Sequence, residues 1–284
     1  MSSFRDNIKK HKYQYLNKYL AKEKMKKNYL KVIKETPILN TPNFCSIFGG
    51  SDKTSLKTDK KGHIKSLEFV ALKNMVFQIE KKTTFPYIYK VVSNFYESDN
   101  LYIDSRFTIP INLSEKKANP LQHILDPNKI LKRLVSHLGK KYVWGGNYSK
   151  GVDDLLKFYP PSKNIDKDLL DKWILKGVDC SGILFEATNG FTPRNTENLL
   201  NFKKPVHIEN LTSNEIAKKV KPLDIIVFEG HVVIVLDKNY TIESRENFGV
   251  IKTPIIDRLK EIHKTKIPKN RYLNPQDYVI RRLF

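Results

Sequence analysis

The chain has 284 residues, of which 51 are lysine or arginine and 30 are aspartate or glutamate, so its formal net charge at pH 7 is +21. Hydrophobic residues make up 40% of the sequence and aromatic residues 11%, a composition that excludes a wholly disordered chain. No apolar run approaches the roughly 18 residues that a membrane-spanning helix needs, so the sequence predicts no membrane span.

The charge does not indicate a nucleic-acid partner, because lysine supplies most of it and the lysines are spread along the whole chain. The two cysteines, Cys45 and Cys180, cannot form a disulfide framework, and neither a CxxC nor an HExxH pattern is present. We therefore expect no nucleic-acid partner, no metal and no cofactor. The basic start of the chain leads into no apolar stretch of the kind found in secretory signals, which favours a cytoplasmic location over a non-standard export route.

Residues 1–36 are predicted to form a basic helical segment. The stretch 4–34 contains neither glycine nor proline, and its apolar residues, among them Leu30 and Ile33, recur at loosely helical spacing. Prolines and glycines then interrupt residues 37–63, which predicts a linker.

Residues 64–120 show a period of two instead. Four short β-rich runs are separated by turn residues: SLEFVALK, MVFQIEKK, YIYKVVSNFY and NLYIDSRF. This pattern predicts a small all-β antiparallel barrel and resembles the bacterial SH3-like modules that accompany cell-wall enzymes.

Residues 121–284 predict an α+β domain. A helix is expected over Pro127–Gly139, followed by a Gly-rich turn, a long polar insertion over 147–177, a short helix and several strands. Helices first and an antiparallel sheet afterwards are typical of an α+β architecture.

Cys180 is a candidate nucleophile. Asp179 is a suitable N-cap for a helix that ends at Asn189-Gly190, which places Cys180 in the first turn of that helix. Unpaired backbone N–H groups and the helix dipole there favour the thiolate over the thiol. The alternative is a buried structural cysteine.

His231 is predicted to begin a buried strand. The length of the loop to the next strand decides which side chains of that strand lie on the same face of the sheet as His231. A connecting loop of three residues puts Glu243 on the same face as His231, whereas a two-residue loop puts Ser244 and Glu246 there. We favour the three-residue loop, because Ile242 then points into the core. A thiolate, an imidazole and a carboxylate that orients the imidazole would form a nucleophilic triad.

Several motifs resemble the NlpC-type cell-wall cysteine peptidases, a papain-like family. They occur in the order of that family and cover about 140–245: YVWGG, DCSG, TPRNT and a Gly-His that opens a Val/Ile strand. The resemblance implies a papain-like catalytic domain over 121–284, with Cys180 as the nucleophile and His231 as the general base. The third residue of the family is usually a histidine about twelve positions after the base, and here that position holds Glu243.

The same resemblance implies a substrate. Family members that cleave free stem peptides bind the amino terminus of the substrate at positions that correspond to Tyr142, Asp179 and Ser181. The expected function is hydrolysis of peptidoglycan stem peptides or muropeptides, at the bond between γ-D-glutamate and a diamino acid. The alternatives are an amidase or acyltransferase with the same triad, or an inactive wall-binding protein. The insertion over 147–177, which the typical member lacks, is expected either to reshape the cleft or to be a surface excursion.

Overall fold

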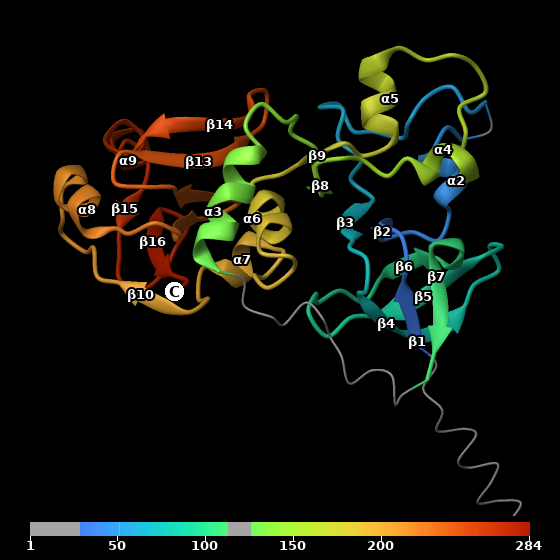
Figure 1. Ribbon diagram of the computed structural model, residues 1–284, viewed down its shortest axis with the longest axis horizontal. Helices are drawn as coiled ribbons and strands as arrows, with labels where there is room; N and C mark the ends of the chain where they lie inside the picture. Colours follow the sequence, from blue (N-terminus) through green and yellow to red (C-terminus); the bar gives the residue numbers. More distant parts are fainter. Residues whose placement is uncertain (1–28, 51, 113–125) are drawn as a thin grey trace, which may run out of the picture.

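The computed structural model describes residues 29–50, 52–112 and 126–284 (Figure 1). Two large sheets lie in separate halves of the molecule, the N-terminal sheet coloured blue to green and the C-terminal sheet orange to red (Figure 1). Within these ranges, strand pairs are antiparallel except for one short parallel pair, β15 with β16. The chain is therefore α+β with antiparallel sheets, as the sequence predicts. No helix in the described part of the chain has the length and apolar character required to cross a membrane.

The N-terminal sheet has seven strands in the order β3-β2-β6-β5-β4-β1-β7. Their bounds are Tyr29–Val32 (β1), Thr36–Leu39 (β2), Leu67–Ala71 (β3), Val76–Lys82 (β4), Ile88–Val92 (β5), Leu101–Asp104 (β6) and Thr108–Ile111 (β7), with the 3-10 turn η1 at Ser105–Phe107. The four β-rich runs expected from the sequence correspond to β3, β4, β5 and β6. Their likeness to an SH3 module stays a prediction.

Two sequence predictions before residue 64 are wrong. The end of the predicted N-terminal helix is β1, which pairs with both β4 and β7; the rest of that helix lies in residues 1–28, outside the described residues. Leu30 enters the core of the sheet while Ile33 is 37% exposed, so pairing with distant strands overrides the loosely helical spacing. The predicted linker 37–63 begins inside β2, a paired strand of the sheet that contains Pro37.

The remainder of the predicted linker packs against the insertion 147–177. The linker contributes α2 (Phe44–Ile47), and the insertion contributes α4 (Asp154–Phe158) and α5 (Lys167–Trp173), which lie beside α2 in Figure 1. Fully buried Trp173 lies in one apolar cluster with side chains of α2, and its indole N–H donates to the Tyr159 carbonyl at 2.8 Å. The short strands β8 (Asn147–Tyr148) and β9 (Gly177–Val178) pair and close the base of the insertion.

The C-terminal sheet has the strand order β10-β16-β11-β12-β13-β14, with β15 beside β16. The bounds of its strands are Lys204–Val206 (β10), Asp224–Phe228 (β11), His231–Val235 (β12), Tyr240–Arg245 (β13), Gly249–Pro254 (β14), Ile267–Pro268 (β15) and Asp277–Arg282 (β16). The helices of this half are α3 (Pro127–Ser136), α6 (Gly182–Ala187), α7 (Thr196–Leu199), α8 (Ser213–Lys219) and α9 (Ile255–His263).

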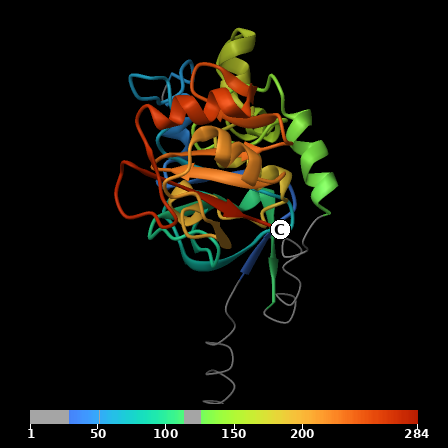
Figure 2. The same ribbon diagram turned by 90° about the vertical axis from the view of Figure 1, so that its left-hand side faces the viewer.

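Helices cover both faces of this sheet, and strand alternation assigns the side chains of β12 to one face or the other. Val232 and Ile234 pack into the cluster that contains α3 and α6, whereas Val233 and Val235 pack into the cluster that contains α8 and α9. Figure 2, which looks onto the C-terminal half, shows α8 and α9 on the near side of the strands. The sheet is therefore a central layer, with the cysteine-bearing helix on one side and α9 on the other.

Candidate active site

Cys180 lies directly before α6, at the point where β9 turns into that helix. The Asp179 carboxylate accepts the Gly182 N–H at 2.7 Å, and its backbone carbonyl accepts the Ile183 N–H at 3.1 Å. Asp179 thus bonds the first turn of the helix, but the N-cap residue is Ser181, two positions later than the sequence predicts. Cys180 therefore lies in the turn before the buried helix and not in its first turn.

The thiol of Cys180 is buried, and only 7% of the residue is exposed. Its Sγ donates to the Gly230 carbonyl at 3.7 Å, and the Val232 N–H is also directed at the sulfur. Burial, and then the charge of Asp179, raise the pKa of the thiol to about 12. The expected lowering of this pKa by the helix N-terminus is therefore wrong, because the loss of solvent outweighs the favourable backbone dipoles.

His231 and Glu243 are hydrogen-bonded, as the parity argument predicts. Ile234 pairs with Ile242 and Val235 with Thr241, a register that leaves a three-residue loop between the paired ends Leu236 and Tyr240. The imidazole Nε2 lies 2.6 Å from Glu243 Oε2, and Glu243 is fully buried.

Burial pushes the pKa of Glu243 up. Hydrogen bonds and charge from His231 and Arg258 outweigh this effect, so the pKa lies below its usual value. The side chains that the alternative register would bring to His231 have other partners. The Ser244 hydroxyl donates to the Val178 carbonyl at 2.7 Å, and Glu246 pairs with His63 at 3.3 Å.

The thiol of Cys180 and the imidazole of His231 are not hydrogen-bonded to each other among the described residues. Strand alternation puts the His231 side chain, whose ring packs with Phe228, on the α8 and α9 face of the sheet, opposite to Cys180. The thiol contacts the backbone on both sides of His231, at the Gly230 carbonyl and the Val232 N–H. It packs in the cluster on the α6 face of the sheet, whereas Glu243 receives bonds from α9 on the other face. Because Nε2 of the imidazole is bonded to Glu243, Nδ1 is the nitrogen left to accept the thiol proton.

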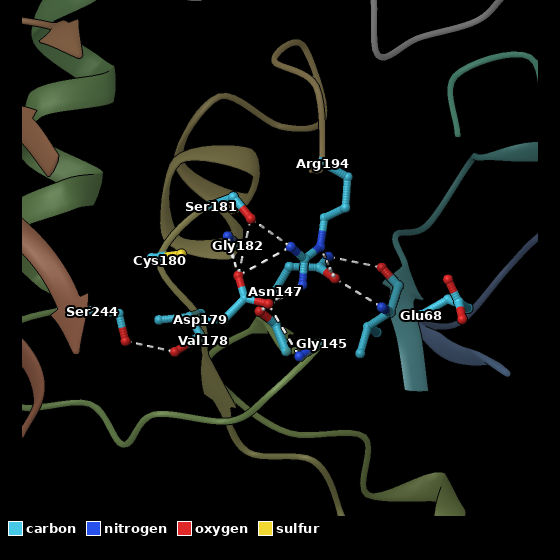
Figure 3. Close-up of polar contacts among 12 residues, drawn as sticks. Glu68, Gly145, Asn147, Val178, Asp179, Cys180, Ser181, Gly182, Arg194 and Ser244 are labelled. Atoms are coloured by element: carbon cyan, nitrogen blue, oxygen red, sulfur yellow. Dashed lines mark hydrogen bonds and ion pairs between the residues drawn. The ribbon is translucent and has the colours of Figure 1, made fainter. Parts of the chain in front are cut away.

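Asp179 is paired with Arg194, a residue that sequence reasoning gave no role (Figure 3). The guanidinium donates to both carboxylate oxygens of Asp179, at 3.0 and 2.6 Å, and to the Ser181 hydroxyl at 2.8 Å. Arg194 is only 3% exposed. Asp179 therefore belongs to an internal ion pair, and its expected role in binding a substrate amine stays a prediction.

Arg194 also links this turn to the N-terminal half. Its Nε donates to Asn147 Oδ1 at 3.2 Å, and the Asn147 amide exchanges two hydrogen bonds of 2.8 Å with the backbone of Val70 in β3 (Figure 3). Arg194 belongs to the TPRNT motif, but this motif did not predict its contacts with Asp179 and Asn147. Asn147 had no signal beyond its place after YVWGG.

A cavity of about 390 Å³ opens beside the thiol and is lined by both halves of the molecule. The C-terminal half contributes Tyr142, Trp144, Gly145, Asp179, Cys180, Ser181, Arg194, Asn195, Thr196, Glu197 and Gly230, and the N-terminal half Lys65, Leu67, Glu68 and Tyr96. All three residues expected to bind substrate thus reach the cavity. Ser181 is already bonded to Asp179 and Arg194, and burial raises the pKa of Tyr142.

Glu68 is a cavity residue that sequence reasoning missed. Its Oε2 accepts the Tyr96 hydroxyl at 2.6 Å and its Oε1 accepts the Asn40 amide at 2.8 Å. No ion pair of Glu68 occurs within the described residues, which distinguishes it from Asp179. Over the same residues, no group of three or more His, Cys, Asp or Glu side chains is arranged to hold a metal ion.

Comparisons with known proteins give matches of structure only. No protein-family model matches the sequence. No curated protein matches it either. An NlpC/P60 family protein from Bacillus cereus is 14% identical, with a TM-score of 0.35; the match covers 92% of this chain and 64% of that one, so this chain spans less than two thirds of its length.

Two further structures have comparable sequence identities and TM-scores. NlpC2 from Trichomonas vaginalis is 17% identical over 89% of this chain and 71% of that one, with a TM-score of 0.32. RipD from Mycobacterium tuberculosis, described as a non-catalytic NlpC/p60 domain protein adapted to peptidoglycan binding, is 14% identical over 57% of this chain and 100% of that one, with a TM-score of 0.33. The names of these three solved structures all contain NlpC.

Proposed function

We propose that this chain is a cysteine peptidase that hydrolyses peptidoglycan stem peptides, with Cys180 as nucleophile, His231 as general base and Glu243 as the orienting carboxylate. The observations that carry the proposal are the His231–Glu243 hydrogen bond and the bond of the Cys180 thiol to the carbonyl of Gly230, the residue directly before His231. The motifs YVWGG, DCSG and Gly-His, which resemble those of NlpC-type peptidases, support the same assignment.

The reaction begins with transfer of the thiol proton to Nδ1 of His231. Because the pKa of the buried thiol is raised, the thiolate forms with this transfer and not before it. The step requires the His231 imidazole, which packs with Phe228 on the α9 face of the sheet, to reach Sγ, which bonds the Gly230 carbonyl on the other face. The thiolate then attacks the peptide carbonyl carbon, and the imidazolium returns the proton to the leaving amine as the C–N bond breaks. Water hydrolyses the resulting thioester, with His231 again as the base.

For the substrate we propose a stem peptide with a free amino terminus, cleaved between γ-D-glutamate and a diamino acid. Glu68 is better suited than Asp179 to hold the substrate ammonium, because Arg194 already neutralises Asp179. Tyr142 and Tyr96 would form the walls of this part of the cavity. A charge-assisted hydrogen bond to the ammonium would select peptides over intact wall.

Incubation with defined muropeptides and mass analysis of the products test the proposal. The unmodified protein and Cys45→Ala are expected to release the same cleaved peptides, and Cys180→Ala none. Glu243→Gln is expected to cleave roughly ten- to ten-thousand-fold more slowly, as when the carboxylate of other triads is replaced. Turnover by Cys180→Ala would refute the assignment of the nucleophile, and transfer of the acyl group to an added amine in place of water would indicate an acyltransferase.

One observation favours a second candidate, a peptidoglycan-binding protein without catalysis. The thiol is bonded to the Gly230 carbonyl and not to the imidazole, and it packs on the sheet face opposite to Glu243. Under this alternative, muropeptides would bind to the unmodified protein and to Cys180→Ala with equal affinity, and neither protein would release products. Calorimetric titration alongside the product analysis separates the two candidates.

A further inference from the structure

Glu243 has a second cationic partner, Arg258 on α9. We infer that Arg258 is a positioning residue that orients the Glu243 carboxylate toward His231 and, by compensating the charge of that carboxylate, favours the state in which the His231–Glu243 pair has released its proton. The catalytic consequence rests on the proposed function. The orientation and the proton release do not, and they can be measured without a substrate.

The geometry of the contact fixes the carboxylate plane. Arg258 Nε donates to Glu243 Oε1 at 2.6 Å, and one terminal guanidinium nitrogen of Arg258 donates to Oε2 at 2.8 Å. Oε2 is the same oxygen that lies 2.6 Å from His231 Nε2. A two-point fork restricts rotation of the carboxylate, which a single bond to the imidazole would leave free. Arg258 therefore determines where Oε2 lies relative to the ring.

Arg258 is itself held in place. It is 5% exposed, and its α9 neighbours Ile255, Leu259 and Ile262 pack in the cluster on that face of the sheet. The remaining guanidinium nitrogen lies 3.0 Å from Glu261, which also pairs with Arg245 of β13 at 2.7 Å. The guanidinium group of Arg258 is therefore held in place by burial, by the packing of α9 and by Glu261.

The sign of the electrostatic effect follows from charge counting. When the buried His231–Glu243 pair holds its proton, its net charge is zero, and when it loses the proton its net charge is −1. With Arg258 included, these totals become +1 and zero, so Arg258 favours the state without the proton. The conclusion holds whichever atom carries the proton, because the two groups titrate as a pair. Arg258 thus keeps the imidazole available as a base at lower pH than Glu243 alone would allow.

The other charged and titratable groups around the pair do not replace Arg258. Glu261 and Arg245 largely offset each other and are more exposed, with 42% and 28% of their side chains accessible. On the same side of the sheet, His263 is bonded to Ser213 and Tyr278. The Cys180 thiol lies on the other side, and its raised pKa keeps it neutral at the relevant pH.

The test compares Arg258→Met, Arg258→Lys and a matched control, Arg281→Met, in the full chain. Arg281 is a buried arginine of β16 that bonds the Leu200 carbonyl and Asn201, away from the site. NMR follows the His231 imidazole signals against pH, with the resonance assigned by His231→Gln. Thermal unfolding verifies the fold of each variant, and kcat and KM for muropeptides are measured across the same pH range.

In Arg258→Met we expect the midpoint of the His231 titration, and the acid limb of kcat/KM, to move up by about one pH unit or more. Arg258→Lys retains the charge without the fork, so its midpoint should stay close to that of the unmodified protein while kcat falls about tenfold at unchanged KM. Arg281→Met should lower the Tm and leave the midpoint unchanged.

An unchanged midpoint in folded Arg258→Met, or an equal shift in Arg281→Met, would overturn the inference. An unchanged kcat in Arg258→Lys would overturn the orienting role, and this variant decides the question if Arg258→Met does not fold. If no protein cleaves muropeptides, the proposed function fails, while the His231 titration still decides whether Arg258 sets the proton release.

Discussion

At the scale of single residues, burial and backbone N–H groups have opposite effects on the pKa of Cys180, and burial has the larger effect. A backbone N–H at the start of a helix favours a thiolate, but this thiol is almost completely buried and lies next to the Asp179 carboxylate. Burial and the neighbouring charge both favour the neutral thiol. The resting state is therefore a protonated cysteine that becomes a nucleophile only as its proton moves to a base.

This environment predicts slow alkylation of Cys180. At about pH 7 and without substrate, iodoacetamide should label exposed Cys45 and leave Cys180 largely unmodified. Because the raised pKa is about 12, each pH unit below it changes the thiolate fraction about tenfold, so labelling of Cys180 should be about a hundredfold faster at pH 9 than at pH 7. Mass spectrometry of Cys45→Ala measures this rate, and unfolded protein in urea is the control for intrinsic reactivity. Rapid stoichiometric labelling at pH 7 would show that the thiolate is already formed.

The buried Asp179–Arg194 pair gives a second prediction at this scale. Asp179→Asn removes the charge that balances a guanidinium of which only 3% is exposed, so it should cost about 3–5 kcal/mol of unfolding free energy. The double variant Asp179→Asn with Arg194→Met removes both charges and should be more stable than Asp179→Asn alone. Urea unfolding monitored by circular dichroism measures both values. Equal stability of the single and double variants would contradict the view that the unpaired charge is the main cost.

The site was predictable from sequence only where a local rule linked two residues. Strand parity identified Glu243 as the partner of His231, because the two lie on adjacent strands joined by a three-residue loop. The partners Arg258 and Arg194 belong to other elements, and only tertiary packing brings their guanidinium groups to these carboxylates. The ion pair between Asp179 and Arg194 could not be predicted for the same reason.

At the scale of elements, the apolar cluster shared by the presumed linker and the insertion gives a third prediction. Trp173, the last residue of α5 in the insertion, is fully buried in one apolar cluster with side chains of α2. Trp173→Ala should therefore destabilise the chain by about 3–5 kcal/mol, the usual cost of truncating a buried aromatic residue. Trp144→Ala is the matched control, because 40% of Trp144 is exposed and the loss should be smaller. Urea unfolding compares the two variants, and equal losses would contradict a structural role for the insertion.

The elements that could be predicted were those with a strong local pattern. The alternation in β3, β4, β5 and β6 was visible in short windows. β1 and β2 were missed because they are short and because their partners lie far along the chain, as in the pairing of Tyr29 with Gln78 and with Ile111. Pro37 also indicated a break rather than a strand.

At the scale of the whole molecule, the cavity beside the thiol exists only because the two halves are held together. Asn147 bonds the backbone of β3 on one side and Arg194 on the other. This tie brings Glu68 and Tyr96 of the N-terminal half to the same cavity as Cys180. The N-terminal half therefore supplies part of the site, and under the proposed function it supplies the group that recognises the end of the substrate.

The last prediction concerns that group. Glu68→Gln keeps the size of the side chain and removes its charge, so a substrate ammonium would lose a charge-assisted hydrogen bond worth about 1.5–3 kcal/mol. The kcat/KM for a peptide with a free amino terminus should fall by roughly ten- to a hundredfold. A peptide with an acetylated amino terminus should be a poor substrate for the unmodified protein and should be cleaved no worse by Glu68→Gln. Glu197→Gln, which changes another carboxylate that lines the cavity, is the matched control and should preserve the preference for the free amine. If Glu197→Gln but not Glu68→Gln loses the preference for the free amino terminus, the substrate ammonium binds at Glu197. Equal cleavage of both peptides by the unmodified protein would show that no carboxylate of this cavity recognises the amino terminus of the substrate.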